Sequence, residues 1–162
     1  LHAKKIPSYG GDTQFVNMNK VFESFKNDQK KYFLKLKATH VYQSKYSKRK
    51  LFKLANNNPN STKKVIHPVV RTHPETGLKS LYINPIRIEN IEGESEENMR
   101  KLIKNIMIKV KSKKFEYRHK WRKGDFVIWD NRILMHKANG DYDMSEDRYL
   151  YRIMLKGDRP YL

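Results

Sequence analysis

The first clear pattern of apolar positions lies near the start of the chain. Residues 13–18 read Thr-Gln-Phe-Val-Asn-Met, a short run that predicts a strand. Apolar residues then recur at positions 18, 21, 22 and 25, which is the spacing of one helical face. Gly10 and Gly11 precede the strand and predict a turn, because glycine adopts positive φ without steric cost. We therefore expect a turn, a strand and a helix in direct succession.

The strongest periodicity in the chain predicts a helix over residues 95–110. Ser95 can cap its first turn, and Glu96 and Glu97 complement the positive end of the helix dipole. The apolar stripe of this helix consists of Met99, Leu102, Ile103, Ile106 and Val110. Its lysines lie on the other faces, so we expect the stripe to be buried.

The rest of the chain alternates short apolar runs with turn residues. Residues 65–74 and 78–83 read as strands joined by a turn at residues 75–77, which predicts a hairpin. Further predicted strands cover residues 115–121, 126–129, 133–138 and 148–155, with a turn at 123–125. Many short strands with one or two helices are typical of an antiparallel sandwich or barrel with added helices. The predicted class is therefore α+β, mainly β, and 162 residues with 38% hydrophobic content predict a single domain over residues 1–162.

The net charge of +18 raises the question of a nucleic-acid partner. Lysines that neutralise phosphates give non-specific affinity, so a basic β-rich module that stacks bases on Tyr42, Tyr46 and Phe52 is one alternative. A solvated lysine-rich surface accounts for the same charge and is favoured here. The polar, basic segment at about residues 43–64 predicts a mobile insertion, either a lid or a plain surface excursion.

The composition also bounds the compartment and the metal ligands. The chain has no cysteine, which leaves His, Asp and Glu as the strong metal ligands and requires no oxidising environment. No apolar run is long enough to cross a bilayer. The first residue is Leu1, and the opening residues lack the features of a signal peptide. We expect a cytoplasmic protein with no membrane partner, whose true N-terminus precedes this sequence.

Most of the six histidines have ordinary interpretations. His2, His40 and His119 stand alone in polar or basic surroundings and are predicted to be surface imidazoles. His67 and His73 each precede proline, but six residues of extended strand span roughly 20 Å at about 3.3 Å per residue. They cannot share one metal across that distance, so we predict structural roles for both.

His136 differs because it ends an apolar strand that follows the Trp-Asp-Asn-Arg turn at residues 129–132. Its imidazole would be carried on a rigid element, although the pattern alone leaves a core histidine and a ligand both open. Arg148 and Arg152 form a second candidate group, because they share one face of the last predicted strand, about 13 Å apart. They could bind carboxylates or a sulfonate in a cavity, or be solvated on an exposed edge.

Four motifs, taken in order, give the chain a specific resemblance to a known family. They are GGDT at residues 10–13, HPVVRTHPETG at 67–77, the WDNR turn followed by the histidine, and RYLYRIMLKGDRP at 148–160. Over nearly the whole chain except residues 43–64, they resemble the taurine dioxygenase and 2,4-dichlorophenoxyacetate dioxygenase family. The resemblance implies a partial double-stranded β-helix of the jelly-roll, cupin-like type. It also implies an oxygenase that uses Fe(II), O2 and 2-oxoglutarate.

The resemblance further implies roles for individual residues. His136 matches the distal histidine of a two-histidine, one-carboxylate iron site. Arg148 and Thr13 match the pair that holds the far carboxylate of 2-oxoglutarate. Arg152 matches the arginine that meets the anionic head of the substrate, such as a taurine-like sulfonate or a carboxylate. The turn that would support the histidine strand consists of Asp130, Asn131 and Arg132.

One part of the family pattern is missing from this sequence. The family requires a His-x-Asp or His-x-Glu pair upstream of the GGDT turn, and His2 is followed two residues later by Lys4. We therefore expect the C-terminal portion of an enzyme, inactive by itself, whose complete form hydroxylates a small organic anion with release of succinate and CO2. A catalytically inactive structural relative is the remaining alternative, and a homo-oligomer is left open.

Overall fold

The computed structural model describes residues 1–42, 44–47 and 63–162. Its helices are α1 (Met18–Glu23), α2 (Asn27–Lys35) and α3 (Glu96–Val110), followed by a 3-10 helix at Lys113–Phe115. Its strands are β1 (His2–Lys5), β2 (Thr13–Asn17), β3 (Lys37–Val41), β4 (Lys64–Pro68), β5 (Val70–Thr72), β6 (Lys79–Leu81), β7 (Ile88–Ile91), β8 (Glu116–His119), β9 (Leu134–Ala138) and β10 (Tyr149–Tyr151). The predicted α+β class, mainly β with added helices, is confirmed.

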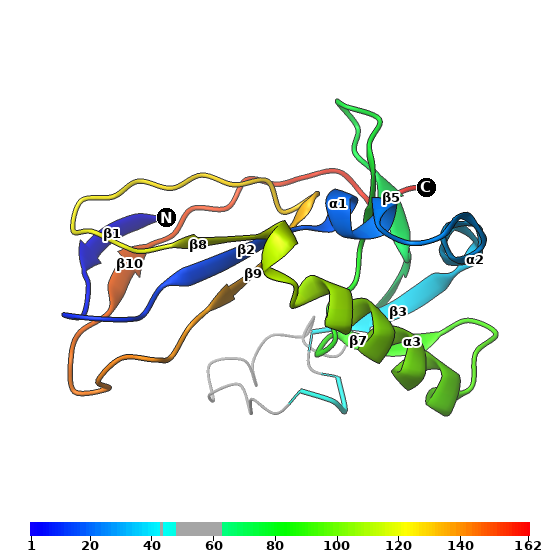
Figure 1. Ribbon diagram of the computed structural model, residues 1–162, viewed down its shortest axis with the longest axis horizontal. Coiled ribbons are helices and arrows are strands. Elements are labelled where there is room, and N and C mark those ends of the chain that lie inside the picture. The colour runs from blue at the N-terminus through cyan, green and yellow to red at the C-terminus, as the bar shows by residue number, and fades with distance from the viewer. Residues whose placement is uncertain (43, 48–62) are drawn as a thin grey trace.

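Within the described residues, the strands form four small sheets in which every pairing is antiparallel. The sheets have the orders β1-β10, β8-β2-β9, β4-β3-β7 and β5-β6. Figure 1 shows the first two sheets toward one end of the molecule, while α2, β3 and β5 lie toward the other. The β8-β2-β9 sheet joins an early strand to two strands from much later in the chain. It is this sheet that carries the candidate site.

The main core lies where α1 and α3 pack against each other, α1 also against β6 and α3 also against β7. Val21 of α1, Ile88 of β7 and Ile106 of α3 are completely buried in one apolar cluster. Burial of each such side chain contributes roughly 1.5–3 kcal/mol, so this cluster anchors the helices to the strands. The Asn19 side chain of α1 also donates a hydrogen bond of 2.7 Å to the carbonyl oxygen of Lys79 in β6.

Several local predictions are confirmed by these elements. Ser95 caps α3, its hydroxyl accepting a hydrogen bond from the backbone N–H of Asn98 at 3.2 Å. Of the predicted stripe, Met99, Ile106 and Val110 are buried, whereas the other two residues are half-buried. The β2 strand passes directly into α1, as predicted, and β5 and β6 form the predicted hairpin around residues 73–78.

Other predictions were wrong in place or extent. Residues 126–129 form no strand, and Phe126 makes only an isolated bridge to His2. The strand predicted over residues 148–155 is limited to Tyr149–Tyr151, because its partner β1 is itself short and bulged. Four elements, α2, β1, β3 and β7, were not predicted. Residues 43 and 48–62, most of the predicted mobile insertion, lie outside the described residues.

Truncation of the α3 stripe should destabilise the fold strongly. Ile106→Ala should lower the free energy of unfolding by about 2–5 kcal/mol, because it removes methyl groups from a fully buried site and leaves a cavity. Ile108→Ala is the matched control, since Ile108 lies on the same helix with 62% of its surface exposed and should change stability by less than about 0.5 kcal/mol. Urea denaturation of both variants measures the difference, and equal losses would contradict this packing.

Candidate functional site

One face of the β8-β2-β9 sheet carries two of the predicted site residues, Thr13 and His136. The β2–β9 register pairs Phe15 directly with His136, and the β2–β8 register pairs Phe15 with Tyr117 and Thr13 with His119. Directly paired residues of antiparallel strands project to the same side, as do alternate residues of one strand. Thr13, Phe15 and His136 therefore share one face of the sheet.

The His136 imidazole is flanked by aromatic rings and remains partly open to solvent. Its ring centroid lies 5.0 Å from that of Trp129 and 6.2 Å from that of Phe15. This partial burial, together with the positive charge of Arg152, lowers the pKa of His136 below its usual value. The imidazole is therefore neutral at neutral pH, the form that coordinates a metal ion.

Arg148 reaches the same region from the start of β10. Its Nε donates a hydrogen bond of 2.7 Å to the carbonyl oxygen of Gly11, and its Nη2 lies 3.4 Å from the Thr13 hydroxyl oxygen. Thr13 is almost completely buried. Among the described residues, no other group accepts a hydrogen bond from the Arg148 guanidinium, so its remaining N–H groups can bind an added anion.

A pair of glycines permits this close approach of a side chain to the backbone. Gly11 has φ of +64°, and a methyl group at this position would lie 3.1 Å from Cδ of Arg148. Gly10 has φ of +68° and packs against the backbone of Asp141. Both positive φ values and both contacts disfavour any residue with a Cβ atom. The Arg148 side chain therefore packs directly against the backbone of the GGDT motif.

Arg118 ties this turn to the loop before β10. Its Nε donates to Oδ2 of Asp12 at 2.7 Å, and its Nη2 pairs with Oδ2 of Asp141. Asp141 in turn accepts a hydrogen bond of 3.0 Å from the backbone N–H of Gly11. Asn139, just beyond β9, donates from both its backbone and its side chain to the Asp12 carbonyl oxygen. The turn before β2 and the end of β9 are therefore joined.

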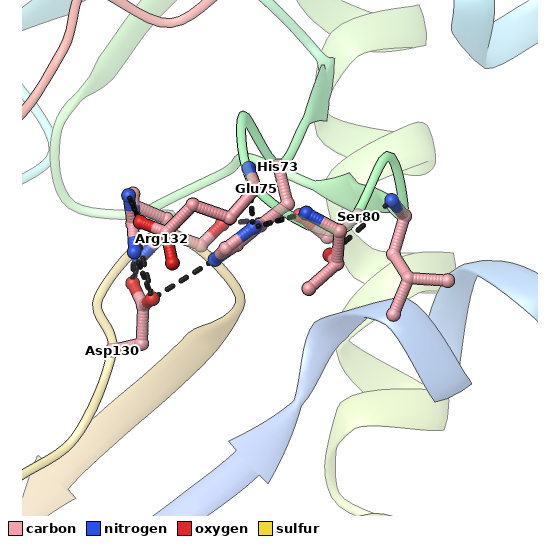
Figure 2. Close-up of polar contacts among 7 residues, drawn as sticks. His73, Glu75, Ser80, Asp130 and Arg132 are labelled. Carbon is pink, nitrogen blue, oxygen red and sulfur yellow. Dashed lines mark hydrogen bonds and ion pairs between the residues drawn. The ribbon is translucent and has the colours of Figure 1, made fainter.

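Figure 2 shows how the turn before β9 is held by the β5–β6 hairpin. Asp130 accepts from the backbone N–H and the guanidinium of Arg132, each at 2.7 Å, and from Nε2 of His73 at 2.9 Å. Arg132 also pairs with Glu75 at 2.8 Å, and its carbonyl oxygen accepts from the Ser80 hydroxyl at 3.1 Å. Arg132 and then His73 hold the pKa of Asp130 far below its usual range. This network orients β9, the strand that carries the candidate ligand His136 at its middle position.

Asn131 and Arg152, the remaining predicted site residues, do not contact Thr13 or Arg148. The Asn131 side-chain oxygen accepts a hydrogen bond of 2.8 Å from the Trp129 indole, which fixes the ring beside His136. Arg152 is exposed, and its guanidinium contacts the sulfur of Met154. Arg148 and Arg152 flank the short β10 strand rather than sharing one long strand, so the structure brings Arg148, but not Arg152, into contact with Thr13.

Sequence reasoning missed Trp121 and misjudged His119. Trp121 is buried, and its indole nitrogen donates a hydrogen bond of 3.0 Å to the Thr13 hydroxyl oxygen. The predicted surface role of His119 is wrong: its ring lies edge-on to Trp121, with centroids 4.5 Å apart, and its Nε2 pairs with Asp125 at 3.1 Å. The one available signal was that an indole on a predicted strand needs an acceptor when it is buried.

The predicted surface role of His40 is also wrong. His40 lies on β3, and its ring centroid is 5.4 Å from that of His67 on β4 and 5.6 Å from that of Tyr82, which follows β6. Burial, and then the proximity of His67, lower the pKa of His40 to about 4, so this imidazole is neutral at physiological pH. The pair contains only two metal-binding side chains. Across residues 1–42, 44–47 and 63–162, no three His, Asp or Glu side chains converge as a metal site.

Comparison with known proteins identifies the family to which these features belong. The sequence profile described as "Taurine catabolism dioxygenase TauD, TfdA family" matches residues 1–154. The chain belongs to this family. The predicted resemblance is therefore confirmed. No helix in the described part of the chain is both long enough and apolar enough to span a membrane.

Several individual proteins are similar to this chain in sequence or in structure. An alpha-ketoglutarate-dependent 2,4-dichlorophenoxyacetate dioxygenase from Burkholderia sp. (strain RASC) is 33% identical over 164 residues, covering 98% of this chain and 53% of that protein. A taurine dioxygenase from Burkholderia xenovorans superposes with a TM-score of 0.74 and 28% identity over 90% of this chain and 48% of its own. AAD-2, solved with Mn(II) and N-oxalylglycine, gives a TM-score of 0.77 and 27% identity over 91% of this chain and 58% of its own. The chain spans about half the length of the curated relatives it matches.

The Asp130 network should give stability a specific dependence on pH. The ionised carboxylate stabilises the fold because its pKa in the folded chain lies far below the ordinary value of 3.8. The difference in unfolding free energy between the native chain and Asp130→Asn should therefore be constant above about pH 5 and shrink below about pH 4. Urea denaturation between about pH 7 and about pH 3 measures it.

Asp158→Asn is the control for this experiment, because Asp158 is exposed and forms no ion pair with a described residue. Its curve should run parallel to that of the native chain over the whole range. If the unfolding free energy of Asp130→Asn stays below that of the native chain by the same amount at about pH 3, the amide substitution acts by altered packing and not by loss of charge.

Proposed function

We propose that this chain is the C-terminal portion of an Fe(II)- and 2-oxoglutarate-dependent dioxygenase. The complete enzyme would hydroxylate a small organic anion, a taurine-like sulfonate or a carboxylate, and release succinate and CO2. The observation that carries this proposal is the contact between Arg148 and Thr13 on the sheet face that also bears His136. A guanidinium and a hydroxyl beside a neutral imidazole suit a diacid that reaches from a metal ion to the arginine.

In this proposal Arg148 and Thr13 bind the far carboxylate of 2-oxoglutarate. The guanidinium is anchored through its Nε to the Gly11 carbonyl oxygen, which leaves Nη1 available as a donor. The Gly11 contact also restricts the Arg148 side chain before the ligand arrives, so less entropy is lost on binding. A buried hydroxyl and a fixed cation at one end of the site favour a carboxylate over a neutral group at that position.

His136 fits one position of the iron site, because its lowered pKa keeps the imidazole neutral and its ring packs against the adjoining rings of Trp129 and Phe15. Bound Fe(II) with 2-oxoglutarate and O2 supplies the oxidising chemistry for hydroxylation. The aromatic rings shield one side of the imidazole from water. One imidazole does not hold Fe(II) usefully, so we assign the other two ligands to a His-x-Asp or His-x-Glu pair outside this sequence. That same segment would complete the double-stranded β-helix, and the chain alone would be inactive.

Arg152 is proposed to meet the anionic head of the substrate. Two observations support this role: the positive charge of Arg152 contributes to the lowered pKa of His136, and no acidic side chain of the described residues pairs with its guanidinium. The relatives are named for 2,4-dichlorophenoxyacetate and taurine, both of which carry an anionic group. A chain without cysteine needs no oxidising compartment, so the proposed location is the cytoplasm.

Turnover by the full-length protein tests the proposed function directly. With Fe(II), O2 and 2-oxoglutarate, it should form succinate in step with a hydroxylated product for at least one member of a panel of sulfonates, aryloxyacetates and alkyl sulfates. His136→Ala should abolish this reaction, because one of three metal ligands is lost. A protein that forms no succinate, yet binds single-stranded nucleic acid in a salt-sensitive way unaffected by His136→Ala, would refute the proposal.

Substitution of Arg148 and substitution of Arg152 should weaken different ligands, 2-oxoglutarate in the first case and the substrate in the second. Arg148→Ala should weaken 2-oxoglutarate binding by about 10- to 100-fold, the worth of a charged hydrogen bond, and leave substrate affinity within about twofold. Arg152→Ala should do the reverse. Arg122→Ala, which removes an exposed cation, is the control for loss of general positive charge. Dissociation constants for both ligands measure this, and equal effects of both variants on both ligands would show that the roles are misassigned.

A further inference from the structure

The buried Thr13 hydroxyl receives two donors from the protein. The indole N–H of Trp121 donates to Oγ1 at 3.0 Å, and Nη2 of Arg148 approaches the same oxygen at 3.4 Å. Indole and guanidinium groups can donate hydrogen bonds but cannot accept them. Thr13 is 2% exposed and Trp121 is 8% exposed, so water does not compete freely for either contact.

This arrangement restricts what the hydroxyl can do. A threonine oxygen has two lone pairs and one proton, and here both lone pairs face donors. The hydroxyl proton is then left to point away from both, toward an acceptor. Among residues 1–42, 44–47 and 63–162, no group accepts a hydrogen bond from Thr13 Oγ1. An ionised carboxylate oxygen, which accepts hydrogen bonds and donates none, suits the position that this proton faces.

We infer that Trp121 is a positioning residue that commits the Thr13 hydroxyl to donate to the far carboxylate of 2-oxoglutarate, an inference that rests on the proposed function. The indole acts through Thr13 and does not touch the ligand. Without its N–H, the Thr13 hydroxyl could turn and donate toward other groups, so the ligand would have to reorient it on binding. The indole therefore raises affinity for the distal carboxylate by preorganising a donor.

The surroundings of Trp121 hold the indole in this direction. The His119 ring meets it edge-on at an interplanar angle of 84°, and His119 is itself paired with Asp125 at 3.1 Å. The same Asp125 oxygen accepts a hydrogen bond of 2.8 Å from the backbone N–H of Arg122, which closes the turn after Trp121. The alignment thus depends on β8 and the turn that follows it, and not on the ligand.

A double-mutant cycle on the full-length, Zn(II)-loaded protein tests the inference by calorimetry. Its corners are the native protein, Trp121→Phe, Thr13→Val and the double variant, each titrated with 2-oxoglutarate and with 2-oxobutyrate, which lacks the distal carboxylate. Trp121→Phe should weaken 2-oxoglutarate by about 5- to 20-fold and 2-oxobutyrate by less than about twofold. In the Thr13→Val background, the same change should weaken 2-oxoglutarate by less than about twofold, because there is no hydroxyl left to orient.

Trp129→Phe is the matched control. It also removes an indole N–H from a hydrogen bond, in this case one of 2.8 Å to Asn131. Whatever it does to metal binding, the ratio of the two oxo-acid affinities should stay at the native value. A Trp121→Phe protein with the native ratio, or one that weakens 2-oxoglutarate as much in the Thr13→Val background, would overturn the inference.

A second measurement covers the case in which Trp121→Phe does not fold. In the Zn(II)-loaded native protein, the nitrogen-15 NMR signal of the Trp121 indole should shift on addition of 2-oxoglutarate and remain within its linewidth on addition of 2-oxobutyrate. Equal responses to the two acids would overturn the inference. A native protein that binds both acids equally well would refute the proposed function too, whereas a native preference for 2-oxoglutarate that is independent of Trp121 would refute the inference alone.

Discussion

The antiparallel pairing of β2 with β9 is the constraint on which the candidate site depends. It sets Phe15 opposite His136, and through the alternation of β2 it places Thr13 on the same face. A slip of one residue in this register would turn His136 to the other side of the sheet and separate it from Thr13. β2 ends at Asn17 and β9 begins at Leu134, so no hairpin turn sets their register, and contacts outside the strands help to hold it.

Those contacts lie at both ends of β9. Before the strand, Asp130 bonds to His73 of the neighbouring hairpin, and beyond the strand Asn139 bonds to the carbonyl oxygen of Asp12 at 2.9 Å. Asp12 is also paired with Arg118, so the turn that precedes β2 is fixed at the same time. Polar networks of this kind orient a site without supplying its chemistry, because each member holds a strand or turn that carries a functional side chain.

The same region holds the Arg148 guanidinium in a fixed position beside the buried Thr13 hydroxyl. Arg148 lies across Gly11 because only a residue without Cβ leaves room for its side chain, and the Thr13 hydroxyl accepts hydrogen bonds from both Arg148 and Trp121. Two donors are thus directed at the Thr13 hydroxyl oxygen. No carboxylate of the described residues forms an ion pair with Arg148. In the proposed function, a diacid would bind with one end at this cation and the other near the neutral imidazole of His136.

The sequence by itself determined the elements whose signals are local: the passage from strand to helix between Asn17 and Met18, the helix capped by Ser95 and the hairpin whose turn begins at His73. It also determined the family, because the order of four motifs needs no coordinates. Only the tertiary structure decided that His40 is half-buried against His67 and that Trp121 bonds to Thr13. The physical reason is that periodicity and capping depend on residues within one or two turns of each other. Burial and the direction of a side-chain hydrogen bond depend on which distant strands become neighbours.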